Sequence, residues 1–389
     1  MLKTNVGQSI DIDGFKSGVE SATKASKKIT EPKIGVLATS VMYDQQDVYK
    51  GIKSVLGNVP IIGMTSTGGI MTPEGIISSE KGFSGLMLFE DENLTVGVAG
   101  KEKDTDDVRE IGRQIAKEAM KNAGKKTSPN YFMMIASPKD EESYLNGIQD
   151  VIGRVPMFGG SAADEAINGD WRIICNNKDF SEGCAVAFFY TESALEVEFT
   201  GSYEETGEVG VLTEVDGKRH LLEIDGVPAL KKIANWLNSN PDDLMGTNLL
   251  LASCSNPIGV KDPTGTIRLT RLPWIGCPDY SIRIGNDMAA GTAIFALRAS
   301  QEDLIDSSKQ TITDVVTKLG TKAKGYLLFH SISRKFAAGD KLSQVYEDIK
   351  EQCGNKPFLV IFSFGEYGYR EHSANYCATG MLTYVGFGK

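Results

Sequence analysis

The sequence predicts an α+β fold of repeated βαβ-hairpin units, with mixed sheets covered by helices. The first observation is an internal repeat, because residues 51–63 return as residues 147–159 with Gly, Ile, Val, Gly, Val, Pro and Gly in register. A looser third copy spans residues 346–357. The second observation is that each copy follows a short apolar run, which is typical of a buried strand. We expect a layered α/β/β/α sandwich.

Each copy has the same order of predicted elements. Apolar runs predict the opening strands at residues 33–38, 131–136 and 325–329. Apolar residues at helical spacing then predict three helices. Glycines that suit a helix C-terminus with positive φ follow them, at Gly57, Gly153 and Gly354. A proline and a second apolar strand come next, at residues 60–62, 156–158 and 357–362.

The first two copies continue into pairs of strand-like runs separated by a polar turn. The runs are residues 83–89 with 94–98, and residues 184–190 with 195–199. Their second arms alternate between apolar and polar residues, so one face should meet water. We expect the two arms of each pair to form a hairpin.

The second half begins with a different pattern. Residues 211–224 predict a hairpin around an Asp-Gly turn. Residues 256–287 are rich in proline and glycine, and we interpret them as a lid, a long surface loop or part of a site. A helix predicted over residues 301–319 leads into the third copy. We divide the chain into domains of residues 1–204 and 205–389.

Composition and charge exclude several classes of partner. The chain has 389 residues, of which 41% are hydrophobic and 24% are charged, as in an ordinary globular protein. A net charge of −10 argues against binding to nucleic acid or to an anionic membrane. No apolar run approaches the ~20 residues that span a bilayer, and the N-terminus lacks a signal-peptide core. We therefore expect a cytoplasmic protein with no nucleic-acid or membrane partner.

No common motif for catalysis or metal binding is present. The 6 cysteines form no CxxC pair, so buried free thiols are expected. The sequence has no HExxH, Walker loop or nucleophile elbow. We predict that the protein is not an enzyme and holds no metal and no cofactor.

A candidate ligand site lies where the loops after the second strands converge. These loops combine glycine, hydroxyl and carboxylate groups, which allow close approach and oriented polar contacts. The predicted residues are Ser66, Thr67, Gly68, Gly160, Ser161, Asp164 and Glu366. Candidates for the opposite wall are Arg283, His330, Arg334, His372 and Asn375. Carboxylates could hold an ammonium group and an arginine a carboxylate, as an amino-acid-like zwitterion requires. The alternative is that these carboxylates pair with arginines or cap backbone amides.

The order of these motifs resembles the FIST family over nearly the whole chain. The resemblance rests on residues 60–69, 155–164, 223–230 and 364–368, on the segment around Gly291, and on the His372 and Asn375 stretch. Two positions depart from the family pattern. The first loop ends in Gly68-Gly69 instead of Gly-Glu, and His330 stands where many members have cysteine.

The resemblance implies a sensory module that binds small molecules such as amino acids. The chain has no room for an output domain beyond the two FIST halves, so a stand-alone sensor would signal through an unidentified protein partner. Some family members are described as haem-dependent gas sensors, which makes haem binding an alternative, with His330 or His372 as the axial ligand. A further alternative is a cysteine-dependent enzyme, with Cys254 activated by either histidine.

Overall fold

The structure, a computed structural model, describes residues 1–265 and 268–388. Three six-stranded mixed sheets share one strand order. The first runs β1 (Lys3–Ser9), β6 (Ser84–Glu90), β2 (Ile34–Thr39), β3 (Ile61–Thr65), β10 (Ile173–Cys175), β11 (Lys178–Phe180). The second runs β7 (Thr95–Glu102), β12 (Gly183–Tyr190), β8 (Tyr131–Ala136), β9 (Met157–Ser161), β24 (Glu366–Tyr369), β25 (Asn375–Ala378). The third runs β13 (Leu195–Thr200), β26 (Leu382–Gly388), β22 (Ala323–Ser331), β23 (Phe358–Ser363), β4 (Ile70–Thr72), β5 (Gly75–Ile77). A parallel pair of strands thus lies inside each sheet.

The outer hairpin of each sheet comes from a different copy of the repeat. The β4–β5 hairpin of the first copy pairs with β23 of the third. The β10–β11 hairpin of the second copy pairs with β3 of the first. The β24–β25 hairpin of the third copy pairs with β9 of the second. Each copy therefore gives a hairpin to one neighbour and receives one from the other, which makes the exchange cyclic.

The hairpins predicted for residues 83–98 and 184–199 are wrong, although their strands are confirmed. β6 pairs with β1 and β2, whereas β7 pairs with β12. In the same way β12 pairs with β7 and β8, whereas β13 pairs with β26. The polar turn after each first arm carries the chain into the next sheet. Alternation along a strand indicates which side chains are buried, and it does not indicate which strand lies beside it.

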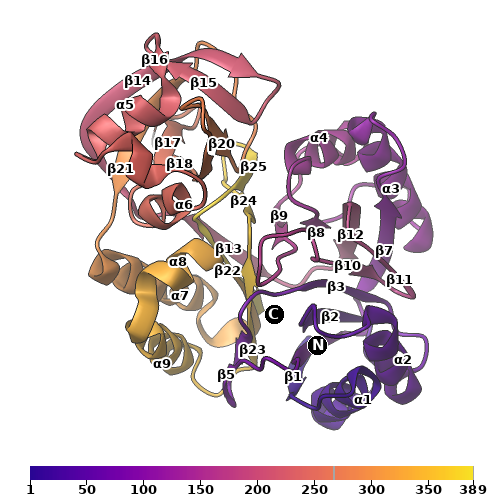
Figure 1. Cartoon of the computed structure of the whole chain (residues 1–389). Coiled ribbons are helices and arrows are strands. Elements are labelled where there is room, and N and C mark those ends of the chain that lie inside the picture. The colour runs from indigo at the N-terminus through magenta and orange to yellow at the C-terminus, as the bar shows by residue number, and fades with distance from the viewer. Residues whose placement is uncertain (266–267, 389) are drawn as a thin grey trace.

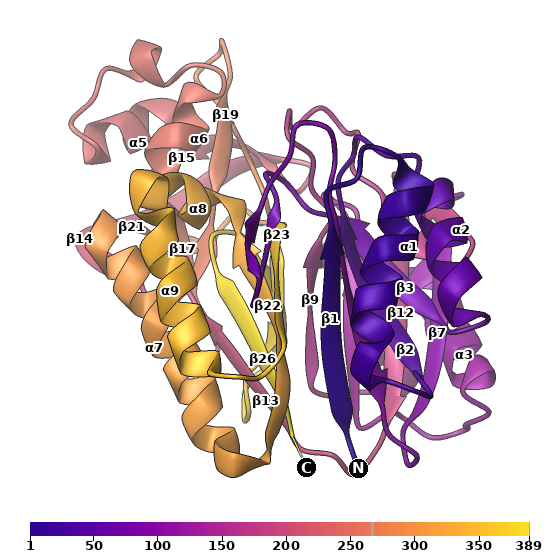
Figure 2. The ribbon, with the colours of Figure 1, turned by 90° about the horizontal axis from the view of Figure 1, so that it is seen from below.

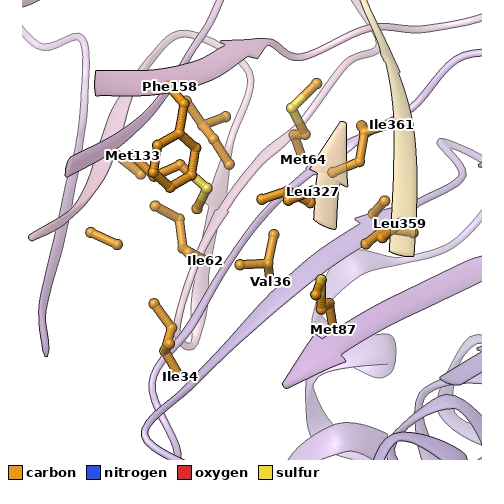
Figure 3. Packing of buried hydrophobic residues seen from close by; sticks show 14 of the residues in the cluster. Ile34, Val36, Ile62, Met64, Met87, Met133, Phe158, Leu327, Leu359 and Ile361 are labelled. Carbon is orange, nitrogen blue, oxygen red and sulfur yellow. The ribbon is translucent and has the colours of Figure 1, made fainter. Parts of the chain in front are cut away.

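The inner faces of the three sheets meet in one hydrophobic core (Figure 3). Ile34 and Val36 of the first sheet, Met133 of the second and Leu327 and Leu359 of the third belong to it. The alternate residues of the same strands face outward. Leu37 of β2, for example, packs under the helices that cover the first sheet. Both faces are therefore apolar, as expected for parallel strands covered on both sides.

Helices cover the outer face of each sheet, so the α+β fold class is confirmed. The first sheet carries α1 (Gly14–Ala25) and α2 (Gln45–Leu56), and the second carries α3 (Val108–Asn122) and α4 (Glu141–Ile152). The third carries α7 (Gln301–Leu319), α8 (Ile332–Ala338) and α9 (Leu342–Cys353). Figure 1 shows these groups around the centre, and Figure 2 shows the sheets between helices on either side. Short 3-10 helices lie at Ser26–Lys28, Pro241–Leu244, Gly320–Lys322 and Gly339–Lys341.

The repeated glycines are explained by how the covering helices cross. Gly51 of α2 lies against the carbonyl oxygen of Phe15 in α1, and Gly147 of α4 lies against that of Arg109 in α3. A Cβ atom at either glycine would collide with that oxygen. In the third copy, the position equivalent to Gly51 and Gly147, counted back from the proline that follows the helix, is Asp348 of α9. Its carboxylate accepts a hydrogen bond from Nζ of Lys309 in α7 at 2.9 Å. This replacement accounts for part of the weaker sequence match of the third copy.

A fourth sheet is inserted between β13 and α7 (upper left in Figure 1). Its strands are β14 (Glu204–Asp216), β15 (His220–Ile224), β16 (Val227–Pro228), β17 (Ile258–Lys261), β18 (Arg268–Arg271), β19 (Pro273–Gly276), β20 (Ile282–Ile284) and β21 (Ala293–Arg298). Its helices are α5 (Ala229–Trp236) and α6 (Asn248–Ser253). We call residues 204–298, apart from 266–267, the inserted region. The hairpin predicted over residues 211–224 is confirmed by the pairing of β14 with β15.

The interpretation of residues 256–287 as one long surface loop is wrong for its described part. That part holds β17, β18, β19 and β20, while residues 266–267 lie outside the described residues. Proline and glycine occur there because the strands are short and their connections tight. Among residues 1–265 and 268–388, no helix has both the length and the apolar composition that crossing a membrane requires.

The helix crossing yields a prediction about stability. Gly147→Ala should lower the free energy of unfolding by about 1–3 kcal/mol, because the added methyl group forces α3 and α4 apart. Gly14→Ala in the first turn of α1 is the matched control, since its Cβ would meet no atom closer than 3.4 Å. The control should be neutral or slightly stabilising. Urea denaturation of both variants tests this, and equal midpoints for the two would contradict the account.

Candidate functional site

A cavity of about 340 Å³ lies where the second sheet, the third sheet and the inserted region meet. The second copy contributes residues that follow β8 and β9, including Lys139, Glu141, Ile167 and Trp171. The inserted region contributes residues including Arg219, Leu272, Trp274 and Arg283. The third copy contributes Ser331, Ile332, Phe364 and Thr379. Its size suits a small organic molecule.

Much of the cavity wall is apolar and aromatic. Trp171 and Phe364 meet edge to face, with their ring centroids 6.0 Å apart. The indole N–H of Trp171 donates to the carbonyl oxygen of Ser181 at 2.8 Å, which fixes the ring. Trp274 of β19 lines the same cavity from the inserted region. These rings would bury the apolar part of a ligand.

Two cavity residues have strained backbones. Lys139 has a φ of 101° and Ile167 a φ of 54°, values that are unusual for residues with a side chain and most unusual for a β-branched one. Such conformations persist only where the surroundings impose them, and they occur often at functional sites. Both residues lie in loops at the carboxyl ends of central strands of the second sheet.

Asp164 holds one of these loops in place. Its carboxylate accepts hydrogen bonds from the backbone amides of Asn168, Gly169 and Asp170, at 3.3, 2.9 and 2.8 Å. Only 1% of Asp164 is exposed. Asp164 therefore caps backbone amides, which the sequence analysis gave as the alternative to binding a ligand. Asp164 thus shapes the loop that presents Ile167 and Trp171.

A buried ionic network joins the inserted region to the second sheet. The guanidinium of Arg219 binds Glu141 at 2.6 Å, Glu142 at 2.5 Å and Asp287 at 2.8 Å. Glu141 lines the cavity, and Ser161 donates a hydrogen bond to it at 3.1 Å. Burial, with the neighbouring Glu142 carboxylate, raises the pKa of Glu141 to about 7, although Arg219 opposes this shift. Perturbed carboxyl groups of this kind are common at functional sites.

Arg283 is the cavity's second arginine, and its surroundings differ. It lies on β20, directly opposite His220 of β15, and its residue is exposed. Among the described residues, its side chain has no hydrogen-bond or ion-pair partner. Arg219 is neutralised by three carboxylates, so Arg283 is the guanidinium with free capacity for an anion.

Glu366 lies in the interior and does not line this cavity. Its carboxyl group receives hydrogen bonds from the Ser363 hydroxyl and the Met381 amide, each at 2.9 Å. Burial raises the pKa of Glu366 to about 8, against the effect of these hydrogen bonds. Gly160 pairs with Glu366 in the β9–β24 ladder.

Other residues that were predicted to bind the ligand instead make hydrogen bonds that join the sheets. Ser66 receives a hydrogen bond from the Phe362 amide at 2.9 Å, and the Thr67 amide donates to the Phe362 carbonyl oxygen at 3.3 Å. The buried guanidinium of Arg334 donates to carbonyl oxygens of Gly201 at 2.6 Å and Leu304 at 3.0 Å. Asn375 donates to the Val155 carbonyl oxygen at 2.9 Å.

The two histidines and the cysteine of the alternative hypotheses lie outside the cavity lining. His330 is buried and its Nδ1 lies 2.8 Å from the Tyr384 hydroxyl, and burial holds the pKa of His330 well below its usual range. The side chain of His372 is 89% exposed in the turn between β24 and β25. Burial raises the pKa of Cys254 to about 12, so its thiol stays protonated at neutral pH.

Of the predicted residues, only Arg283 lines the 340 Å³ cavity. Gly68 and Asp164 line another cavity, of about 530 Å³, between the loops of the first two copies. Glu141, Arg219 and Trp171 are cavity residues that the sequence did not single out. Glu141 could have been found from its place in the first helical turn after a buried strand. Trp274 lies within residues 256–287, and one of the interpretations of that segment was that it forms part of a site.

Comparison with known proteins yields a family match. The chain matches the FIST N domain model over residues 33–227 and the FIST C domain model over residues 229–369. No curated protein sequence matches it.

Several solved structures show a remote likeness. The cyanuric acid hydrolase from A. caulinodans has a TM-score of 0.42 at 8% identity, with 100% of each chain covered. Another cyanuric acid hydrolase has a TM-score of 0.35 at 11% identity, again with 100% of each chain covered. A chorismatase has a TM-score of 0.37 at 8% identity, with 100% of this chain and 98% of that chain covered.

Burial of Glu366 predicts a pH dependence of stability. Its pKa rises from 4.5 to about 8 on folding, so between these pH values the folded state keeps a proton that the unfolded chain releases. The free energy of unfolding therefore falls as pH rises through this range, by up to about 1.4 kcal/mol per pH unit. Glu366→Gln cannot ionise and should melt higher than the wild type at pH 8–9, with the difference vanishing towards about pH 4.5.

Melting temperatures between pH 5 and 9 provide the measurement. Glu371→Gln is the control, because the Glu371 side chain is 77% exposed. Parallel pH profiles for Glu366→Gln and the wild type would show that the Glu366 pKa is not raised.

Proposed function

This chain belongs to the FIST family, whose domains are signal-transduction sensory domains, and on that premise we propose that it senses a small amphipathic carboxylate in the 340 Å³ cavity. The observation that carries the proposal is the position of Arg283. Its guanidinium has no polar partner among the described residues, and it lines the same cavity as Trp171, Trp274 and Phe364. A cation and an aromatic wall in one cavity match a carboxylate with an apolar part.

The geometry of a guanidinium favours this class of ligand. Its N–H groups form a planar fork that binds both oxygens of a carboxylate, which is stronger and more selective than a single contact. The aromatic rings that line the same cavity would cover the apolar part of the ligand. An aromatic amino acid or an aromatic keto acid is the simplest molecule with both parts.

Glu141 makes an amino-acid-like ligand the preferred member of this class. It is 2% exposed, and burial raises its pKa to about 7, against the effect of Arg219. A ligand ammonium group nearby would favour its ionised form. This role replaces the one predicted for Asp164 and Glu366, which do not line this cavity.

The cavity walls come from parts of the chain that are distant in sequence, which suits a sensor. A ligand that touches Trp171 and Arg283 together would bind best when the inserted region lies close to the second sheet. Binding would then shift the protein towards that arrangement, in proportion to the difference in affinity. We propose that a partner protein recognises this arrangement.

Binding is a better-supported function than cysteine-dependent catalysis. The thiol of Cys254 is buried, and its raised pKa disfavours the nucleophilic thiolate. Among residues 1–265 and 268–388, those that line the cavity include no cysteine or histidine.

Substitution of Arg283 tests the proposal. The wild type should bind aromatic carboxylates such as L-phenylalanine and phenylpyruvate, and should not bind phenethylamine, which lacks the carboxylate. Arg283→Gln should weaken carboxylate binding by about tenfold or more, because it removes a charge-assisted bidentate contact. Isothermal titration calorimetry with these three probes measures the effect.

Arg298→Gln is the matched control, since Arg298 is an exposed arginine of the same inserted region outside this cavity. The control should bind as the wild type does. Binding of phenethylamine as tight as that of L-phenylalanine, or unchanged affinity in Arg283→Gln, would contradict the proposal.

A further inference from the structure

Three side chains that can bind a metal ion gather on the inserted region. His220 begins β15, while Cys277 and Asp279 lie in the turn between β19 and β20. One ligand atom from each lies within 4.8 Å of the others. His220 and Cys277 are half-buried and Asp279 is exposed, so an ion could reach them from solvent. The cluster is not part of the cavity lining.

The hydrogen bonds around His220 arrange it as a metal ligand. Its Nε2 lies 2.7 Å from the Ser281 hydroxyl, which donates to the Asp279 carboxylate at 2.6 Å. The Ser281 hydroxyl thus bridges Nε2 and the Asp279 carboxylate, and an ion bound by both would displace it. The other ring nitrogen, Nδ1, lies 3.2 Å from the carboxylate of Asp216. A carboxylate on the second nitrogen orients the ring, as is usual for histidines that bind metals.

The turn that carries the other two ligands is closed and anchored. The Cys277 amide donates to the Ser281 carbonyl oxygen, and the Tyr280 amide to that of Cys277, each at 2.9 Å. Tyr280 has a φ of 63°, and its hydroxyl donates to Asp242 at 2.8 Å. Cys277 differs from the other cysteines, which are buried. Its thiol is therefore the one that an ion could approach from solvent without entering the core.

We propose that His220, Cys277 and Asp279 bind a zinc ion. An imidazole, a thiolate and a carboxylate are the ligands that Zn²⁺ takes in proteins, and three of them leave a fourth position for water. Mg²⁺ and Ca²⁺ prefer oxygen ligands and should not compete. Because His220 lies opposite Arg283 in the β15–β20 ladder, the ion would brace the strands that carry the cavity arginine. The site stands independently of the proposed ligand.

Zinc titration of the full chain tests the inference. After dialysis against a chelator, the wild type should bind one Zn²⁺ by calorimetry and no Mg²⁺. Cys277→Ser and Asp279→Asn preserve side-chain shape and should each weaken zinc binding by about 100-fold. Asp216→Asn, which removes the orienting carboxylate, should weaken it by about tenfold. The control His372→Ala, which alters an exposed histidine elsewhere, should bind as the wild type does.

A second readout uses the thiol itself. Ellman's reagent should label Cys277 first in the native protein, because the other cysteines are buried. Zn²⁺ should protect Cys277, and the same protection should be absent in Asp279→Asn. Circular dichroism confirms that each variant is folded. Absence of zinc binding in the wild type, or equal zinc affinity in the wild type and in folded Cys277→Ser, would overturn the inference.

Discussion

The interaction on which the rest of the structure depends is the cyclic exchange of hairpins among the three sheets. No copy completes its own sheet, because its outer hairpin pairs with a strand of another copy. The loops that precede these hairpins must cross between sheets, and they bind one another as they do so. The Ala163 amide donates to Thr65 at 3.0 Å, Thr67 to Phe362 at 3.3 Å, and Ser161 to Gly365 at 2.8 Å. Three loops distant in sequence are therefore held together at one end of the core.

The cavity follows from this convergence together with the inserted region. The crossing loops supply Trp171 and Phe364, and β19 and β20 of the inserted region close over them. Arg219 holds that closure through Glu141, Glu142 and Asp287. A buried arginine without these carboxylates would be costly, whereas Arg283 remains near solvent and needs no partner. Two arginines of one cavity thus differ in role because their surroundings differ, and the residue type alone does not show it.

Much of the fold could be predicted from the sequence, because apolar runs and helical spacing are local signals. They correctly indicated the central strands and the helices that end at Gly57, Gly153 and Gly354. The partner of each strand depends on contacts between distant segments, which is why the arms at residues 83–98 were paired wrongly. The repeat also indicated that the loops converge. It could not indicate that Ser66 and Glu366 turn inward to backbone groups while Arg283 lines a cavity, since both outcomes use the same residue types.

The central claim is that the three sheets are completed by one another and so form one cooperative unit. Native-state hydrogen exchange tests it most directly, because it measures the free energy of opening for each amide. The slowest amides of β2, β8 and β22 should open with the same free energy, within about 1 kcal/mol, and should respond equally to denaturant. If the amides of β2 instead open at a markedly lower free energy, with those of β8 and β22 still protected, the sheets are independent and the account is contradicted.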